Sequence, residues 1–95
     1  MPGDYLFFLY KMDINQKFIS ASEKVHTLDT RPSNDKLLQL YGLYKQATEG
    51  DVQEDRPGGF DFKAIAKYDT WANLKGMSKD DAKQAYIDLV DSLFA

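Results

Sequence analysis

Apolar residues recur every three or four positions in four stretches of this chain, the spacing that places them on one face of an α-helix. The first stretch runs from about Ile14 to Leu28, and Asp13 before it is a suitable N-cap. Its apolar positions are Ile14, Phe18, Ala21, Val25 and Leu28. We expect this stripe to face a core. His26 lies beside the stripe, either as a residue at the rim of the core or as a contact for an anionic ligand.

A second helix is predicted from Asn34 to Glu49, with Ser33 as its N-cap and Gly50 at its C-terminal end. At ~100° per residue its apolar side chains cover about 220°, whereas a surface helix needs little more than about 100°. These side chains are Leu37, Leu38, Leu40, Tyr41, Leu43, Tyr44 and Ala47. The strip left polar consists of Gln39, Gly42 and Gln46. We therefore expect this helix to contact more than one neighbour, which could be another helix or a ligand.

Two further helices follow a connection of about ten residues. The third is predicted from Phe62 to Lys75, with Asp61 as its cap and Gly76 as its stop. The fourth begins after Ser78, which is a good N-cap. Its apolar stripe is Ala82, Tyr86, Leu89, Val90 and Leu93. Four helices without a strand signal predict an all-α, four-helix bundle.

Composition excludes several classes of function. The chain has 95 residues, no cysteine, one histidine and a formal charge of −3. Cysteine-based zinc sites, thiol catalysis and a histidine-rich metal centre are therefore excluded, and a general nucleic-acid binder is disfavoured. The connection matches neither an EF-hand nor a phosphate-binding glycine loop, and no hydrolase or dinucleotide motif is present. We predict a binding protein rather than an enzyme, without metal or cofactor.

Residues 1–12 read as an N-terminal extension ahead of a domain at 13–95. The apolar run from Tyr5 to Tyr10 is far shorter than the ~20 residues of a membrane span, and its front end lacks the positive charge of a signal peptide. We expect the run either to pack on the outside of the domain or to support weak self-association. The protein is expected to be a cytoplasmic monomer.

One face of the second helix carries unusual chemistry. Tyr41, Tyr44 and Lys45 lie three and four residues apart, so they share a side. On the third helix, Lys63 and Lys67 share a side with Trp71, where they either cover the core with their stems or hold phosphates. We expect the face on the second helix to be half of a pocket that the third and fourth helices complete.

The residue types in this pocket favour a particular kind of ligand. Lys45, Lys63 and Lys67 could neutralise a phosphate cluster. Four aromatic residues could stack on a base or line an apolar channel. They are Tyr41, Tyr44, Tyr86 and Trp71. A molecule with phosphates, an aromatic base and an apolar tail would use all of these groups, although they do not by themselves identify it.

At the level of whole motifs, the chain resembles the acyl-CoA-binding protein family from about Phe18 to Leu93, in order and without gaps. The matching motifs are TyrGlyLeuTyrLysGlnAlaThrGluGlyAsp (41–51), ArgProGly (56–58), AspPheLys with AlaLysTyrAspThrTrp (61–71), LeuLysGlyMetSerLysAspAspAla (74–82) and AlaTyrIle (85–87). The resemblance implies an up-down-down-up bundle that binds medium- to long-chain acyl-CoA esters without chemistry. Two alternatives stay open: a module of a larger lipid-metabolising enzyme, such as a fatty-acid isomerase, and a helical protein-interaction domain.

The resemblance also implies roles for individual residues. Tyr41 and Lys45 would contact the adenine and ribose 3′-phosphate end, and Tyr44 would line the nucleotide site. Lys67 would pair with phosphate, and Lys63 would add positive potential nearby. Tyr86 would approach the CoA moiety or the acyl region.

Three positions depart from the family pattern. Tyr68 replaces the usual tryptophan, Ile65 replaces a lysine, and His26 stands where the first helix often carries a basic residue. At this position His26 would be one of the ligand contacts. These changes reduce the positive charge expected at the pocket mouth.

Overall fold

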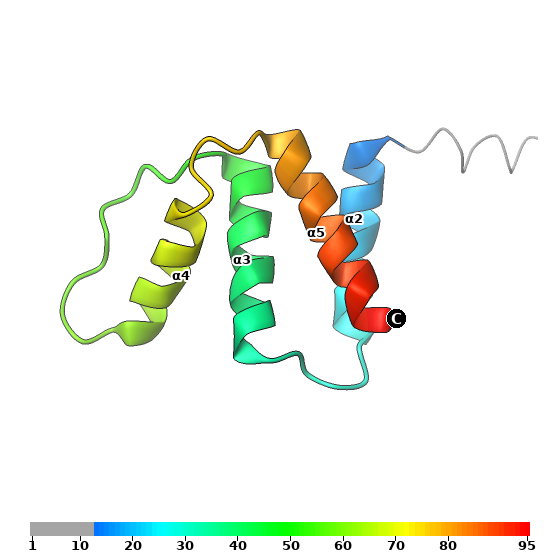
Figure 1. The fold of residues 1–95 in the computed structure, drawn as a ribbon, viewed down its shortest axis with the longest axis horizontal. Helices are drawn as coiled ribbons and strands as arrows, with labels where there is room; N and C mark the ends of the chain where they lie inside the picture. The colour runs from blue at the N-terminus through cyan, green and yellow to red at the C-terminus, as the bar shows by residue number, and fades with distance from the viewer. Residues whose placement is uncertain (1–12) are drawn as a thin grey trace, which may run out of the picture.

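The computed structural model describes residues 13–95 (Figure 1). The predictions for the N-terminal extension, including self-association through Tyr5–Tyr10, concern residues outside this range. Within that range the chain forms α2 (Ile14–Lys24), η1 (Val25–Thr27), α3 (Asn34–Glu49), α4 (Phe62–Ala72) and α5 (Lys79–Phe94). No strand occurs among residues 13–95, so this part of the chain is all-α. No helix in this range is long and apolar enough to cross a membrane.

The four α-helices run up, down, down and up along the chain, as predicted. In Figure 1, α2 and α5 point one way, and α3 and α4 point the other. Helix α3 occupies the centre, packing against α5 on one side and against α4 on the other, while α2 packs against α5. The prediction that this helix contacts more than one neighbour is therefore confirmed.

Short polar residues begin each helix where the sequence predicted them. Asp13 forms a capping box with Gln16, in which each side chain bonds the other residue's backbone N–H. Ser33 Oγ, Asp61 Oδ1 and Ser78 Oγ each accept a bond from the backbone N–H three residues later. These bonds satisfy N–H groups that have no partner inside the helix.

Two helices end earlier than predicted. The first changes to 3₁₀ geometry at Val25, three residues before Leu28. The third ends at Ala72 rather than Lys75, and the backbone continues in turns whose N–H groups bond three residues back, such as Leu74 N to Trp71 O at 2.9 Å. Gly76 closes these turns at φ 92°, a left-handed conformation that suits glycine. Apolar spacing does not separate an α-helical end from such tighter turns.

The core lies between α2, α3 and α5. Its buried residues are Phe18, Ala21, Leu40, Ala47, Ala82, Tyr86 and Val90. The apolar stripes predicted for the first and fourth helices supply most of them, with Val25, Leu89 and Leu93 packed at the edge. Trp71, a residue of α4, is also buried but does not belong to this core cluster, and its Nε1 donates to Gly50 O at 2.8 Å.

The prediction of a polar strip on α3 is wrong for two of its three residues. Gly42 is buried because α4 packs there: a Cβ at this position would lie 2.9 Å from Thr70 Cγ2. Gln46 is fully buried, and its Nε2 donates to Asp51 Oδ1 and to Met77 O, both at 2.8 Å. The strip serves close packing and hydrogen bonding rather than solvation.

Candidate functional site

Two grooves flank α3, one on each side. The first, the α3–α4 groove, has a volume of about 530 Å³ and lies between the N-terminal halves of these two helices. Its lining includes the apolar residues Leu37, Leu38 and Ala66 and the cations Arg31, Lys63 and Lys67. No carboxylate of the described residues lines it. Because α3 and α4 run in the same direction, their N-termini lie at the same end and add positive potential there. This groove suits an apolar chain that carries a negative group.

The second groove, here called the aromatic groove, has a volume of about 510 Å³ and lies between α2, α3 and α5. Tyr44 and Tyr86 line it together with His26, which is exposed in η1. The two phenol rings lie 6.0 Å apart, and each packs on Phe18, with ring centroids 5.5 and 5.0 Å away. The groove therefore offers aromatic faces that rest directly on the core.

Tyr41 connects the two grooves. It is half-buried and lines both of them, as does Leu37 one turn earlier. On the α4 side, the ammonium of Lys67 sits 4.5 Å from the centre of the Tyr41 ring, a cation–π contact. The structure thus joins Tyr41 to Tyr44 and Tyr86 on one side and to Lys63 and Lys67 on the other.

Lys45 is separated from this arrangement, since it lines neither groove. It forms an ion pair with Glu49, and its ammonium lies 4.8 Å from the centre of the Trp71 ring. The hydrogen bond that Lys45 donates to the Glu49 carboxylate raises the pKa of Lys45 above its ordinary value, more than partial burial lowers it. Lys45 therefore stays a cation, but it faces a carboxylate of its own helix.

Trp71 and Tyr86 differ from what their residue types suggested. Trp71 is almost fully buried, and its indole N–H is bonded to Gly50 O, so it holds the fold and offers no stacking face. Tyr86 is also buried, yet it lines the aromatic groove. Burial, followed by the nearby Tyr44, raises the pKa of the Tyr86 phenol. Tyr86 is consequently a neutral donor at the base of that groove.

Of the three positions that depart from the family pattern, His26 lines the aromatic groove and the other two lie elsewhere. Ile65 and Tyr68 are half-buried on α4 and line neither groove.

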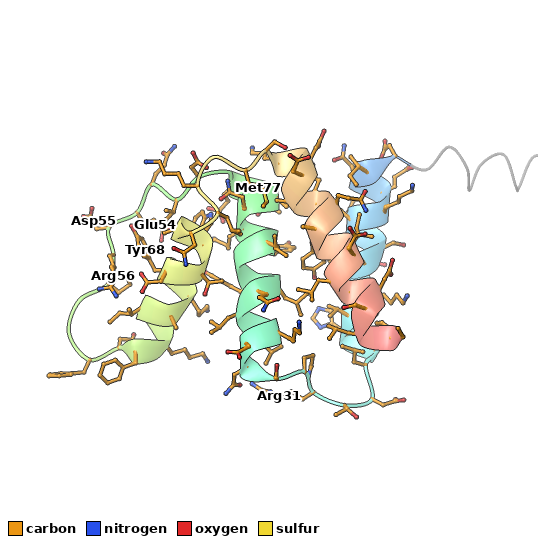
Figure 2. The ribbon with its side chains drawn as sticks, in the orientation of Figure 1. Arg31, Glu54, Asp55, Arg56, Tyr68 and Met77 are labelled. Carbon is orange, nitrogen blue, oxygen red and sulfur yellow. The ribbon has the colours of Figure 1, made fainter. Side chains whose placement is uncertain are left out.

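Arg56 of the connection before α4 binds Asp69 on that helix with two hydrogen bonds of 2.9 and 3.0 Å (Figure 2). This pair lowers the pKa of the Asp69 carboxyl, first through the hydrogen bond and also through charge. It anchors the long connection against α4.

Arg31 is a groove residue that the sequence interpretation missed. It precedes α3, lines the α3–α4 groove and donates from Nη1 to Asn34 Oδ1 at 3.1 Å (Figure 2). In the sequence it belongs to a connector with no periodicity. Its proximity to Lys63 follows from the parallel directions of α3 and α4, which the pattern of apolar positions does not reveal.

The side chains that line the two grooves are typical of a binding surface. Residues 13–95 contain no group of three His, Cys, Asp or Glu side chains placed to hold a metal ion. The grooves present phenols, aliphatic side chains and protonated amines, which bind and orient better than they react. The arrangement can hold an elongated amphiphile with an anionic, aromatic head.

Comparison with known proteins agrees with this arrangement. Residues 15–90 match the family model described as acyl CoA binding protein. The chain is 53% identical to acyl-CoA-binding protein homolog 1 of Caenorhabditis elegans over 78 residues, which is 82% of this chain and 91% of that protein. It is 49% identical to the acyl-CoA-binding protein of Saccharomyces cerevisiae over 82 residues, which is 86% of this chain and 94% of that one.

Solved structures show the same fold. The crystal structure of Oryza sativa acyl-CoA-binding protein 2 superposes with a TM-score of 0.82 at 43% identity, covering 86% of this chain and 91% of that one. That of the protein from Moniliophthora perniciosa superposes with a TM-score of 0.79 at 40% identity, covering 86% and 80%. On the sequence match, the shared fold and the paired grooves, the chain belongs to the acyl-CoA-binding protein family.

Proposed function

We propose that this protein binds medium- to long-chain fatty acyl-CoA esters reversibly, buffering and transporting them as a cytoplasmic monomer. The observation that carries the proposal is the position of Tyr41 between an aromatic groove and a cationic, aliphatic one. An acyl-CoA has the complementary parts: a base that stacks, phosphates that need cations, and an apolar tail. One ligand can therefore occupy both sides of α3.

The nucleotide end is assigned to the aromatic groove. Tyr44 and Tyr86 offer ring faces for the adenine, and His26 at the groove edge is placed to meet an anion. Tyr41 continues this surface toward α4. Lys45 lies on the next turn of the same helix and adds charge at the 3′-phosphate after releasing Glu49.

The acyl tail is assigned to the α3–α4 groove. Leu37, Leu38 and Ala66 supply apolar contact, and Lys63 and Lys67 hold phosphate at the rim. Each buried methylene contributes about 0.8 kcal/mol, so affinity rises with chain length until the groove is filled. Free fatty acid lacks the nucleotide contacts, and free CoA lacks the tail contacts.

No covalent step is part of the proposal. A lysine nucleophile requires a lowered pKa, whereas the pKa of Lys45 is raised. Lys45 acts here as a fixed positive charge. The ligand is accordingly released unchanged.

Isothermal titration calorimetry with palmitoyl-CoA, free CoA and free palmitate tests the proposal. Palmitoyl-CoA is expected to bind more tightly than either fragment, with affinity increasing from octanoyl-CoA to palmitoyl-CoA. Equal affinity for palmitate and palmitoyl-CoA would rule out a nucleotide site. Native mass spectrometry of the same samples should show one protein chain with one ligand, whereas a ligand-bound dimer would contradict the monomer.

A further inference from the structure

Two phenylalanines at the start of α4 are far more exposed than their size predicts. The exposed fractions are 88% for Phe60 and 70% for Phe62, and the rings contact each other edge to face with centroids 6.2 Å apart. The other exposed aromatic residues in the range 13–95 contact a different part of the fold: Tyr44 stacks on Phe18, and Phe94 lies beneath the ammonium of Lys24. Keeping two phenyl rings in water is unfavourable and marks a contact surface. We call this pair the Phe60–Phe62 tip.

The tip stands clear of the rest of the molecule at the N-terminal end of α4. The connection from α3 swings around the outside of α4 and enters that helix at its far end (Figure 1). A Cβ placed on Gly58 or on Gly59 would meet no atom within 4 Å, so this part of the chain stands clear of the rest. The two hydrogen bonds of Arg56 to Asp69 fix the connection on α4 just before it.

Three cations lie at the same end, together with the carboxylate of Asp35 in the first turn of α3. Lys63 follows Phe62 and lines the α3–α4 groove with Arg31 and Lys67, and no carboxylate of residues 13–95 lines this groove. The carboxylate within the tip, Asp61, is occupied as the N-cap of α4, accepting from Ala64 N at 3.1 Å. The N-termini of α3 and α4 also point here. The tip therefore combines aromatic rings with a surface that attracts anions.

We propose that the Phe60–Phe62 tip docks this protein onto membrane surfaces that carry anionic lipid headgroups. The rings enter the interfacial layer, where aromatic residues are favoured, while Arg31 and Lys63 meet headgroup phosphates. A specific protein partner would need about 800 Å² of surface on each side, far more than two protruding side chains offer. Docking does not depend on acyl-CoA binding. If the proposed function holds, docking also brings the open end of the tail groove to the bilayer.

Vesicle flotation of the ligand-free full-length chain tests this proposal. Vesicles of phosphatidylcholine with phosphatidylserine are compared with vesicles of phosphatidylcholine alone. The variant carrying both Phe60→Ser and Phe62→Ser is expected to lose about tenfold or more in partitioning to the anionic vesicles. Ile19→Ser is the matched control, because Ile19 is 55% exposed on α2, away from the tip. It should partition like the unchanged protein.

A second readout does not depend on losing side chains. Phe60→Trp places an indole in the tip, and its fluorescence should shift to the blue when anionic vesicles are added. Trp71 supplies a constant background because it is buried. An unshifted spectrum at vesicle concentrations that bind the protein would place the contact elsewhere and overturn the proposal.

Other outcomes overturn it as well. If the double variant still binds vesicles, or if Ile19→Ser reduces vesicle binding as much as the double substitution does, the tip is not part of the contact. Equal binding to neutral and anionic vesicles removes the role of the cations. A loss of palmitoyl-CoA affinity in the double variant without vesicles assigns the two rings to the ligand site instead. The proposed function fails separately, if the protein without substitutions does not bind palmitoyl-CoA.

Discussion

The two grooves beside α3 have similar volumes but opposite relations to the core. The aromatic groove lies on the core itself, because its Tyr86 is a core residue and its Tyr44 packs on Phe18. The α3–α4 groove is lined only by partly buried and exposed side chains of the described residues, among them Lys63 and Lys67. We therefore expect residues of the first groove to stabilise the fold in addition to their proposed contact with the ligand, whereas residues of the second can be changed with little effect on folding.

Replacing Tyr86 tests the double role of the aromatic groove. Tyr86→Ala removes a buried ring that contacts Phe18 and Tyr44, so it should reduce the free energy of unfolding by about 3–5 kcal/mol. Urea denaturation measures this change. Tyr86→Phe keeps the ring and should stay close to the unchanged protein. A similar loss in both variants would show that the hydroxyl rather than the ring stabilises the core.

Replacing Lys67 tests the opposite behaviour on the α4 side. Lys67→Ala removes the proposed charge-assisted contact to phosphate, which should cost about 1.5–3 kcal/mol or roughly 10- to 150-fold in affinity for palmitoyl-CoA. The melting temperature should change little, because the fold loses only one cation–π contact between two half-buried side chains, worth about 1 kcal/mol. Calorimetry and thermal unfolding measure the two effects. Lys75→Ala is the control, since this exposed lysine lines neither groove.

A parallel loss of affinity and stability in Lys67→Ala would mean that the lysine is structural. The contrast between the grooves would then disappear, because both sides of α3 would couple binding to folding. Loss of affinity in Lys75→Ala as well would indicate a general effect of charge rather than a site.

Gly42 sets how closely α4 approaches α3. In Gly42→Ala the new methyl would lie 2.9 Å from Thr70 Cγ2 and 3.2 Å from Thr70 O, so α4 must move away. Overpacking costs about 1–3 kcal/mol, and the better helix propensity of alanine recovers up to about 1 kcal/mol. We expect a net loss of about 1 kcal/mol in urea denaturation, together with weaker palmitoyl-CoA binding because the α3–α4 groove changes shape.

Two further variants sharpen this prediction. Thr70→Ser added to Gly42→Ala removes the nearer of the two contacts and should restore part of the stability. Gly58→Ala introduces the same methyl where no atom lies within 4 Å and should change stability by less than about 0.5 kcal/mol. A fully stable Gly42→Ala protein would show that α4 is not held closely against α3.

The sequence predicted the fold well because its local signals are strong. The caps at Asp13 and Ser33 and the apolar stripes were readable from residue spacing, and the family motifs supplied the directions of the helices. The neighbourhoods of Gly42 and Gln46 were not readable. A helical projection places both residues on the polar side of the helix. In the structure, α4 packs against Gly42, and Asp51 of the connection bonds to Gln46.

The candidate site shows the same division. Lys63 and Tyr41 were chosen by residue type and face, and the structure places both on the α3–α4 groove. Lys45 lies apart from the two grooves, where it forms an ion pair with Glu49. Residue spacing alone does not determine which partner this lysine takes. Arg31 was missed because its position depends on how two distant segments lie relative to each other.

The α4 side should also be the more sensitive one to acid. Asp51 Oδ1 accepts from Gly76 N and from Gln46 Nε2, both at 2.8 Å, and these bonds lower the pKa of Asp51, with the Gly76 bond the larger cause. A carboxyl whose pKa is lower in the folded state stabilises the fold above its unfolded pKa of about 3.9. This contribution is lost as the pH falls through the folded pKa, because the unfolded chain binds the proton first.

Urea denaturation between neutral pH and pH 2 measures this effect. Asp51→Asn keeps an oxygen acceptor but no longer titrates, so its free energy of unfolding should fall less steeply below about pH 4 than that of the unchanged protein. Asp55→Asn, in the same exposed connection, is the matched control and should follow the unchanged protein. Identical slopes for all three would mean that the hydrogen bonds to Asp51 are equally strong with a neutral carboxyl. The junction between α3, the connection and α5 would then owe its stability to packing rather than to the charge of Asp51.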